Sequence, residues 1–215
     1  MKDWKGNSKS TFSTLGATSH SENEREKDDY YATSPIAVHE LMKVEKFSKT
    51  IWEPAVGGGH IADVLKEYGY NVICSDIVDR GYPGTVIKNF FEYSQNDNDI
   101  ITNPPYKWAA EFTEHALDIS SGGVKVALLL RVQFLESMQR WELFKKYMPV
   151  RIYAFSKRVS CCIGGDFSND KGAVMYCWFI WEKGKREKPV VDWLNTGEET
   201  ENDIQMRFDD VLQEM

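Results

Sequence analysis

Short apolar runs alternate, along most of this chain, with segments whose apolar residues recur every three or four positions. An apolar run rich in β-branched residues is typical of a buried strand, and the longer spacing is typical of a helix with one buried face. The pattern predicts strands at residues 50–54, 71–75, 86–91, 99–102, 124–130, 151–155 and 173–181. It predicts helices at residues 35–44, 61–68, 108–119 and 136–147.

This alternation favours an α/β fold with a mostly parallel sheet, because each helix can serve as the crossover between two parallel strands. Residues 151–155 and 173–181 have no predicted helix between them. We therefore expect these two strands to form an antiparallel hairpin at the edge of the sheet. The predicted fold is an open, doubly wound, Rossmann-like sheet of seven strands.

A single domain over residues 30–181 contains all of these elements, as the length of 215 residues suggests. Residues 1–29 are polar without apolar periodicity and are expected to form a flexible arm. Residues 182–215 are acidic and are expected to form a tail. No stretch approaches the roughly 20 apolar residues that cross a bilayer, and residues 1–29 lack the apolar core of a secretory signal. We expect a cytoplasmic protein without a membrane partner.

The charge and the cysteines narrow the possible partners. The formal net charge is −7, whereas phosphate binding rests on clustered Lys and Arg. Any surface that binds nucleic acid must therefore be local. The four cysteines, which contain no C-x-x-C pair, are expected to be buried reduced thiols rather than metal ligands. They are Cys74, Cys161, Cys162 and Cys177.

Two polar or glycine-rich features follow predicted strands, where open α/β sheets bind their ligands. The first strand ends in Glu53–Gly59, whose glycines permit a tight turn and let a ligand lie against bare backbone. Asp76 ends the second strand, where a carboxylate can accept hydrogen bonds from both hydroxyls of a ribose. Ile77 follows it and could pack on an adenine face.

The most specific feature is the sequence Asn103-Pro104-Pro105-Tyr106 after the fourth strand. An exocyclic amino group is a poor nucleophile because its lone pair is delocalised into the ring. Two acceptors, the Asn103 amide oxygen and the Pro104 carbonyl, would favour a tetrahedral nitrogen with a free lone pair. The prolines hold these acceptors rigidly, and Tyr106 offers a face on which a flipped base can stack.

These motifs resemble a known enzyme family. Glu53–Gly59 is similar to the cofactor loop of class I S-adenosylmethionine-dependent methyltransferases, and Asn103–Tyr106 to the D/N/S-P-P-Y/F/W motif of amino-group methyltransferases. As a set, six segments resemble the small adenine-methyltransferase-like proteins of phages and prophages, over roughly residues 30–181. The segments are Trp52–His60, Asp76–Tyr82, Asn89–Phe91, Thr102–Tyr106, Arg131–Ser137 and Tyr176–Trp181.

The resemblance implies a class I methyltransferase domain that uses S-adenosylmethionine to methylate adenine N6 in DNA. It implies that the cofactor is bound by Thr33, Pro35, Glu53, Pro54, Ala55, Gly57, Gly59, Asp76, Ile77, Asn89 and Phe90. Thr33 and Pro35 would approach its methionine part, and Phe90 would flank its adenine. Asn89 departs from the family, which usually has an acid there, so a contact from this position to the adenine amino group stays open.

Phosphate contacts are expected from four basic residues that precede or flank the loop of residues 159–171, which could carry sequence selectivity. They are Arg131, Arg151, Lys157 and Arg158. The order of the motifs is that of enzymes whose recognition domain follows the catalytic one, and here only residues 182–215 follow. A homodimer or a helper protein could therefore supply further DNA contacts.

Three alternatives remain open. The same chemistry could act on adenine in RNA, which we regard as a less favoured partner than DNA, or on a glutamine amide of a protein. A non-catalytic protein with a cofactor fold would also suit the acidic composition. Methylation of cytosine C5 is disfavoured, because it needs a nucleophilic thiol and the sequence contains no Pro-Cys pair.

Overall fold

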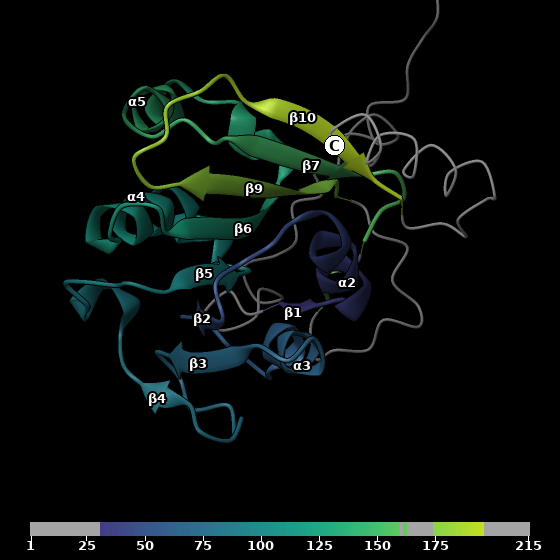
Figure 1. Ribbon diagram of the computed structural model, residues 1–215, viewed down its shortest axis with the longest axis vertical. Helices are drawn as coiled ribbons and strands as arrows, with labels where there is room; N and C mark the ends of the chain where they lie inside the picture. Colours follow the sequence, from purple (N-terminus) through teal and green to yellow (C-terminus); the bar gives the residue numbers. More distant parts are fainter. Residues whose placement is uncertain (1–30, 160, 163–173, 196–215) are drawn as a thin grey trace, which may run out of the picture.

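The computed structural model describes residues 31–159, 161–162 and 174–195. Its main sheet has eight strands in the spatial order β10-β7-β9-β6-β5-β2-β3-β4 (Figure 1). All neighbouring pairs are parallel except those of β9, which is antiparallel to both β6 and β7. The strands are β2 (Thr50–Glu53), β3 (Asn71–Asp76), β4 (Val86–Ile87), β5 (Asp99–Thr102), β6 (Lys125–Arg131), β7 (Arg151–Phe155), β9 (Tyr176–Glu182) and β10 (Val190–Leu194).

The mostly parallel α/β sheet confirms the predicted fold class, but the strand count and the position of the hairpin differ from the prediction. The eighth strand, β10, lies within the segment that was expected to be an acidic tail, and it pairs in parallel with β7. It consequently covers the edge at which the hairpin of β7 and β9 was placed. Leu194 is buried, which anchors β10 to the core although charged residues precede it.

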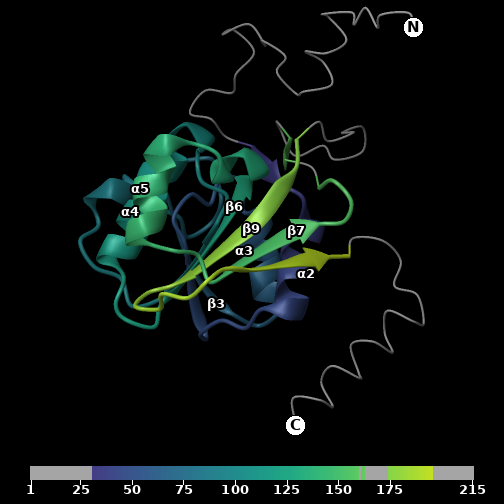
Figure 2. The same cartoon turned by 90° about the horizontal axis from the view of Figure 1, so that it is seen from above.

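Helices cover both faces of the sheet (Figure 2). α2 (Pro35–Val44) and α3 (His60–Glu67) pack on one face, and α4 (Ala109–Ile119) and α5 (Met138–Lys146) pack on the other. Successive residues of β6 point to opposite faces. Leu129 accordingly belongs to the cluster with α2 and α3, and Leu128 to the cluster with α4 and α5. This alternation is why β6 reads as one continuous apolar run.

The strand order reverses between the neighbouring strands β2 and β5. From β2 the chain builds outward through β3 to β4, and it then returns to place β5 and β6 on the other side of β2. The loops that leave the carboxyl ends of β2 and β5 therefore diverge and open a crevice between them, which is where such sheets bind ligands. These are the loops that begin at Pro54 and at Asn103.

A second, two-stranded sheet joins β1 (Ala32–Thr33) to β8 (Cys161–Cys162). The strands are antiparallel, with Thr33 opposite Cys161 and Ala32 opposite Cys162. This small sheet ties the segment before α2 to the segment after β7. In the part of the chain that the structure describes, no helix has the length and apolar character needed to cross a membrane.

Candidate active site

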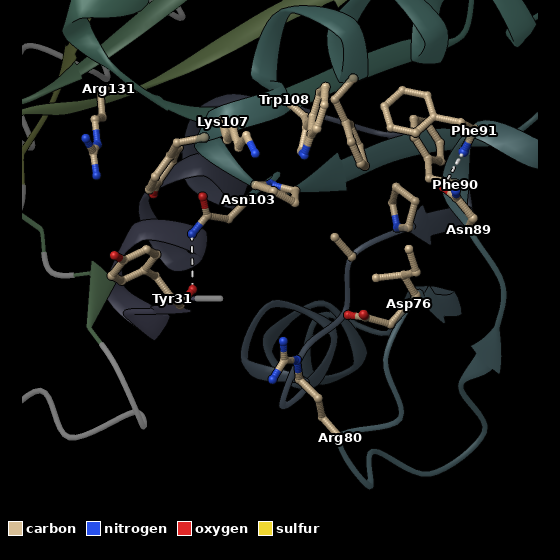
Figure 3. A pocket seen from close by; sticks show the side chains of 16 residues that line it. Tyr31, Asp76, Arg80, Asn89, Phe90, Phe91, Asn103, Lys107, Trp108 and Arg131 are labelled. Carbon is tan, nitrogen blue, oxygen red and sulfur yellow. Dashed lines mark hydrogen bonds between the residues drawn. The ribbon is translucent and has the colours of Figure 1, made fainter. Parts of the chain in front are cut away.

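One cavity of about 930 Å³ lies at the carboxyl ends of the central strands (Figure 3). Its wall contains predicted residues from both loops, from the ends of β3 and β6 and from the segment after β4, so the structure brings them together. They are Pro54, Ala55, Asp76, Ile77, Asn89, Phe90, Asn103, Pro105, Tyr106 and Arg131. Six further residues were not predicted for the site, namely Tyr31, Arg80, Phe91, Lys107, Trp108 and Phe112.

The turn after β2 requires glycine at two positions. Gly57 and Gly59 have φ values of 55° and 89°, in the left-handed region that side chains disfavour. A Cβ atom on Gly59 would lie 2.0 Å from Cε2 of Tyr82, whose hydroxyl donates to Asp63 (2.6 Å) and so holds the ring in place. Both glycines are buried and shape the loop, while Pro54 and Ala55 form the cavity wall.

Asp76 is held by the backbone of two loops. Its Oδ2 accepts from the Gly57 N–H (2.8 Å) and its Oδ1 from the Val78 N–H (2.9 Å). The side chain is 7% exposed and lines the cavity. Because each carboxylate oxygen can accept about two hydrogen bonds, both oxygens keep capacity for a ligand hydroxyl. A rigid double acceptor of this kind suits a vicinal diol such as that of ribose.

Glu53 is a buried carboxyl beside a second, small cavity of about 20 Å³. The Ala62 N–H hydrogen-bonds to Glu53, and among the described residues none pairs with its Oε2. Burial raises the pKa of Glu53 well above its ordinary value. The small cavity is also lined by Thr33, His60 and Asn103, so it adjoins the large one. The arrangement provides an acceptor for a cationic group of a ligand.

The Asn103 amide is anchored through its nitrogen. Its Nδ2 donates to the carbonyl oxygen of Tyr31 (3.3 Å; Figure 3) and also to Oγ1 of Thr33 (3.0 Å). Its Oδ1 is buried, and no described residue donates to it. A buried acceptor without a partner is costly. A ligand that donates a hydrogen bond to this oxygen would remove that cost. Pro104 is buried behind it, and the Pro105 carbonyl accepts from the Trp108 N–H (2.9 Å).

Tyr106 lies in an aromatic and cationic surrounding. Its ring stacks on Tyr31, with centroids 6.0 Å apart and planes inclined by 27°, and it also contacts the ring of Tyr176 at 5.7 Å. The guanidinium of Arg131 lies 4.6 Å from the Tyr106 ring centroid. Burial raises the pKa of the Tyr106 hydroxyl well above its ordinary value. The tyrosine is therefore neutral, and Tyr31, Tyr176 and Arg131 surround its ring.

Apolar side chains form the other end of the cavity. Phe90 is buried and stacks on Phe112 at 4.0 Å, whereas Ile77 is 59% exposed at the cavity wall. The predicted strand over residues 86–91 is only partly present, because it ends at Ile87. Asn89 then accepts from the Phe91 N–H (3.1 Å) through Oδ1 and so begins the 3-10 turn η3 (Phe90–Glu92) that places Phe90 in the wall.

The predicted basic residues lie at opposite ends of the strands. Arg131 is the last residue of β6, and Lys157 and Arg158 follow β7. All three lie at the carboxyl ends of these strands, as the cavity does. Arg151 begins β7 at the opposite end of the strands and is not part of the cavity wall, so its role as a nucleic-acid contact stays a prediction. Its Nε donates to Oε2 of Glu45 (2.6 Å), a buried carboxylate whose pKa falls because Arg151 and Lys125 hydrogen-bond to it.

Several other predictions have mixed outcomes. Thr33 contacts Asn103, and Pro35 provides the first residue of α2 rather than part of either cavity wall. Cys74 and Cys177 are buried as expected, but Cys161 is partly exposed and accepts from Asn103 Nδ2 (3.8 Å). Most of the loop of residues 159–171 lies outside the described residues. Within the described ranges, no group of three or more metal-binding side chains could hold a metal ion.

Lys107, Trp108 and Arg80 had weak signals in the sequence. Lys107 and Trp108 directly follow Tyr106, and the turn η4 (Tyr106–Trp108) carries them back to the cavity. Arg80 lies in the segment after Asp76 that resembles the family. Tyr31 carried no signal, because only the three-dimensional pairing of β1 with β8 places it beside Tyr106.

No family model and no curated protein matches the sequence. Among solved structures, a putative class I S-adenosylmethionine-dependent methyltransferase from Listeria monocytogenes is 14% identical, with a TM-score of 0.58 over 92% of this chain and 75% of that one. A modification subunit of a putative type I restriction enzyme from Vibrio vulnificus is 12% identical, with a TM-score of 0.57 over 98% of this chain and 60% of that one.

A putative RNA methyltransferase from Pyrococcus horikoshii is 13% identical, with a TM-score of 0.52 over 80% of this chain and 98% of that one. The names of these structures differ in substrate, and identities this low establish only the arrangement of the backbone. The chain therefore has the fold of the class I S-adenosylmethionine-dependent methyltransferases.

Proposed function

We propose that the protein transfers a methyl group from S-adenosylmethionine to an exocyclic amino nitrogen, most favourably adenine N6 in DNA. The observation that carries the proposal is the buried Asn103 Oδ1, which has no donor among the described residues and belongs to a residue that lines one cavity with Asp76. An acceptor placed in this way is what an aromatic amine needs in order to react as a nucleophile.

The residues of the cavity fit the cofactor. Asp76 would accept from the ribose hydroxyls, and the apolar side chains of Ile77 and Phe90 would flank the adenine. The unpartnered Oε2 of Glu53 would accept from the ammonium of the methionine part, close to Thr33. When bound, the cofactor supplies a methyl group on a positively charged sulfonium, which makes that methyl electrophilic.

Asn103 then acts on the amine of the substrate. Its Oδ1 accepts one amino hydrogen, and the carbonyl of Pro104 would accept the other, which turns the nitrogen lone pair away from the ring. Pro104 and Pro105 restrict the backbone, so both acceptors are fixed before the substrate arrives. No strong general base is needed, because the nitrogen loses its proton readily once it carries the methyl group and a positive charge.

The surroundings of Asn103 favour a nucleic-acid base over a glutamine side chain. Tyr106, Tyr31 and Trp108 provide aromatic surface for a planar ring. Arg131 and Lys107 bring positive charge to the cavity of a protein whose net charge is −7, which suits the phosphates beside the target nucleotide. Lys157 and Arg158 follow the carboxyl end of β7, at the same end of the strands as the cavity.

In the experiment, the protein is incubated with S-adenosylmethionine that carries a labelled methyl group. Duplex DNA, single-stranded RNA and a glutamine-containing peptide are the three substrates. We expect label in DNA and N6-methyladenine in its nuclease digest, detected by mass spectrometry. Sequencing of DNA from cells that express the chain would locate the modified base and its context. Label in RNA or in the peptide alone would contradict the DNA assignment. Cofactor binding without transfer to any of the three polymers would indicate a non-catalytic protein.

Glu53 predicts a dependence of cofactor binding on pH. Its raised pKa means that the carboxyl of the free protein keeps its proton to higher pH than an ordinary glutamate does, whereas a bound ammonium favours the carboxylate. Binding should therefore release a proton, and affinity should rise with pH until Glu53 is ionised without the ligand. Calorimetry in buffers of different ionisation enthalpy, between roughly pH 5 and pH 7 where an α-amino group stays charged, measures this release. Glu53→Gln should bind more weakly and release none; equal release in the variant would contradict this role.

A further inference from the structure

The amide of Asn103 is fixed in one of its two orientations. An asparagine amide has two N–H donors on Nδ2 and an acceptor on Oδ1. Here Nδ2 is paired with the Tyr31 carbonyl oxygen (3.3 Å) and with Thr33 Oγ1 (3.0 Å). If the amide turned by 180°, Oδ1 would face the Tyr31 carbonyl, and two acceptors would be opposed. The observed orientation leaves Oδ1 as a buried acceptor with no donor among the described residues.

Thr33 is itself buried and paired. It is 3% exposed and pairs with Cys161 in the two-stranded sheet of β1 and β8. Two residues later, Pro35 begins α2, whose residues Ala37, Val38 and Leu41 are buried against the main sheet. The hydroxyl is therefore carried by a backbone that pairs with β8 and leads directly into a packed helix. A hydroxyl oxygen fixed in this way can orient a partner, because little conformational freedom is lost when the hydrogen bond forms.

We propose that Thr33 is a positioning residue, which orients the amide of Asn103 toward the amine of the substrate. This role differs from the contact to the methionine part that the family resemblance implies for Thr33, and it rests on the proposed function. In this role Thr33 acts through Asn103, and the small strand β1 becomes part of the substrate half of the site. The rate of methyl transfer then depends on the Thr33 hydroxyl, whereas cofactor affinity does not.

The test compares Thr33→Val, which keeps the β-branched shape and removes the acceptor, with Thr33→Ser, which keeps the acceptor. For Thr33→Val we expect kcat to fall roughly tenfold, as the loss of one hydrogen bond predicts. The dissociation constant for S-adenosylmethionine should stay within about twofold of the wild-type value. Thr33→Ser should restore most of kcat. Thr113→Val is the control, because Thr113 is equally buried but donates to Ala109 O within α4.

A second readout needs no activity. The side-chain amide signals of Asn103 are identified by NMR as the pair that disappears in Asn103→Ala. Their hydrogen exchange should be slow in the wild type and faster in Thr33→Val. Failure of the wild type to methylate any polymer would refute only the proposed function, since the exchange measurement still decides the role of Thr33.

Three results would overturn the proposal: unchanged kcat in Thr33→Val, unchanged exchange of the Asn103 amide, or weaker cofactor binding with kcat preserved at saturation. The last of these would make Thr33 a cofactor contact. If Thr33→Val unfolds at a lower temperature than the Thr113→Val control, Thr33→Ala and Thr33→Ser are compared by the same measurements, with the same outcomes required.

Discussion

Replacement of Asn103 by alanine is expected to reduce methyl transfer by roughly a thousandfold, the upper range for loss of one preorganised group at a reacting centre. The substitution removes the unpartnered Oδ1 and leaves the amine with at most one acceptor. Affinity for S-adenosylmethionine should stay near the wild-type value, because the cofactor contacts proposed for Asp76 and Glu53 are untouched. Single-turnover transfer and equilibrium binding measure the two effects separately.

The matched control for this variant is Asn71→Ala. Asn71 is an exposed asparagine at the start of β3, at the opposite end of the strand from the cavity. It should leave both transfer and binding unchanged. Transfer by Asn103→Ala at a rate near that of Asn71→Ala would show that Asn103 does not activate the amine, and the proposed chemistry would fail.

Replacement of Asp76 by alanine is expected to weaken S-adenosylmethionine binding by roughly a hundredfold, which corresponds to about 3 kcal/mol. Two hydrogen bonds from ribose hydroxyls to a carboxylate account for this loss. The variant should also melt at a lower temperature, because the N–H groups of Gly57 and Val78 lose their acceptor. Titration calorimetry and thermal denaturation measure the two changes.

Asp192→Ala serves as the control, since Asp192 is exposed on β10 and lies at the far side of the sheet from β3. It should bind the cofactor as the wild type does. Asp76→Asn keeps the shape of the side chain and should keep more of the stability than of the affinity. If Asp76→Ala bound S-adenosylmethionine within about twofold of the control, the ribose contact would have to lie elsewhere.

Much of the fold could be predicted because its signals are local. The alternation of strands and helices gave the parallel sheet, and the polar residues after β2, β3 and β5 gave the main positions of the cavity wall. β10 was missed because its five residues follow a charged stretch, so composition outweighed a short apolar run. Its burial at Leu194 comes from packing, which no window of sequence contains.

The contacts that orient the site could not be predicted, because they join positions far apart in the chain. Asn103 is 70 residues from Thr33, and Arg151 is 106 residues from Glu45. Arg151 looked like a free surface cation because the buried carboxylate that pairs with it has no neighbouring signal in the sequence. Residue type indicated which groups could do chemistry, and tertiary structure decided which of them meet.

Thr33, which positions the Asn103 amide, belongs to the two-stranded sheet of β1 and β8. That sheet contains only two residue pairs. Ladders of this size open at a far smaller free-energy cost than the core strands, and contacts between distant positions form late in folding. On warming, the small sheet of β1 and β8 would come apart while the eight-stranded sheet stays intact. Heat inactivation of the enzyme would then precede its denaturation, and a cross-link between those two strands would raise its working temperature without changing its melting point.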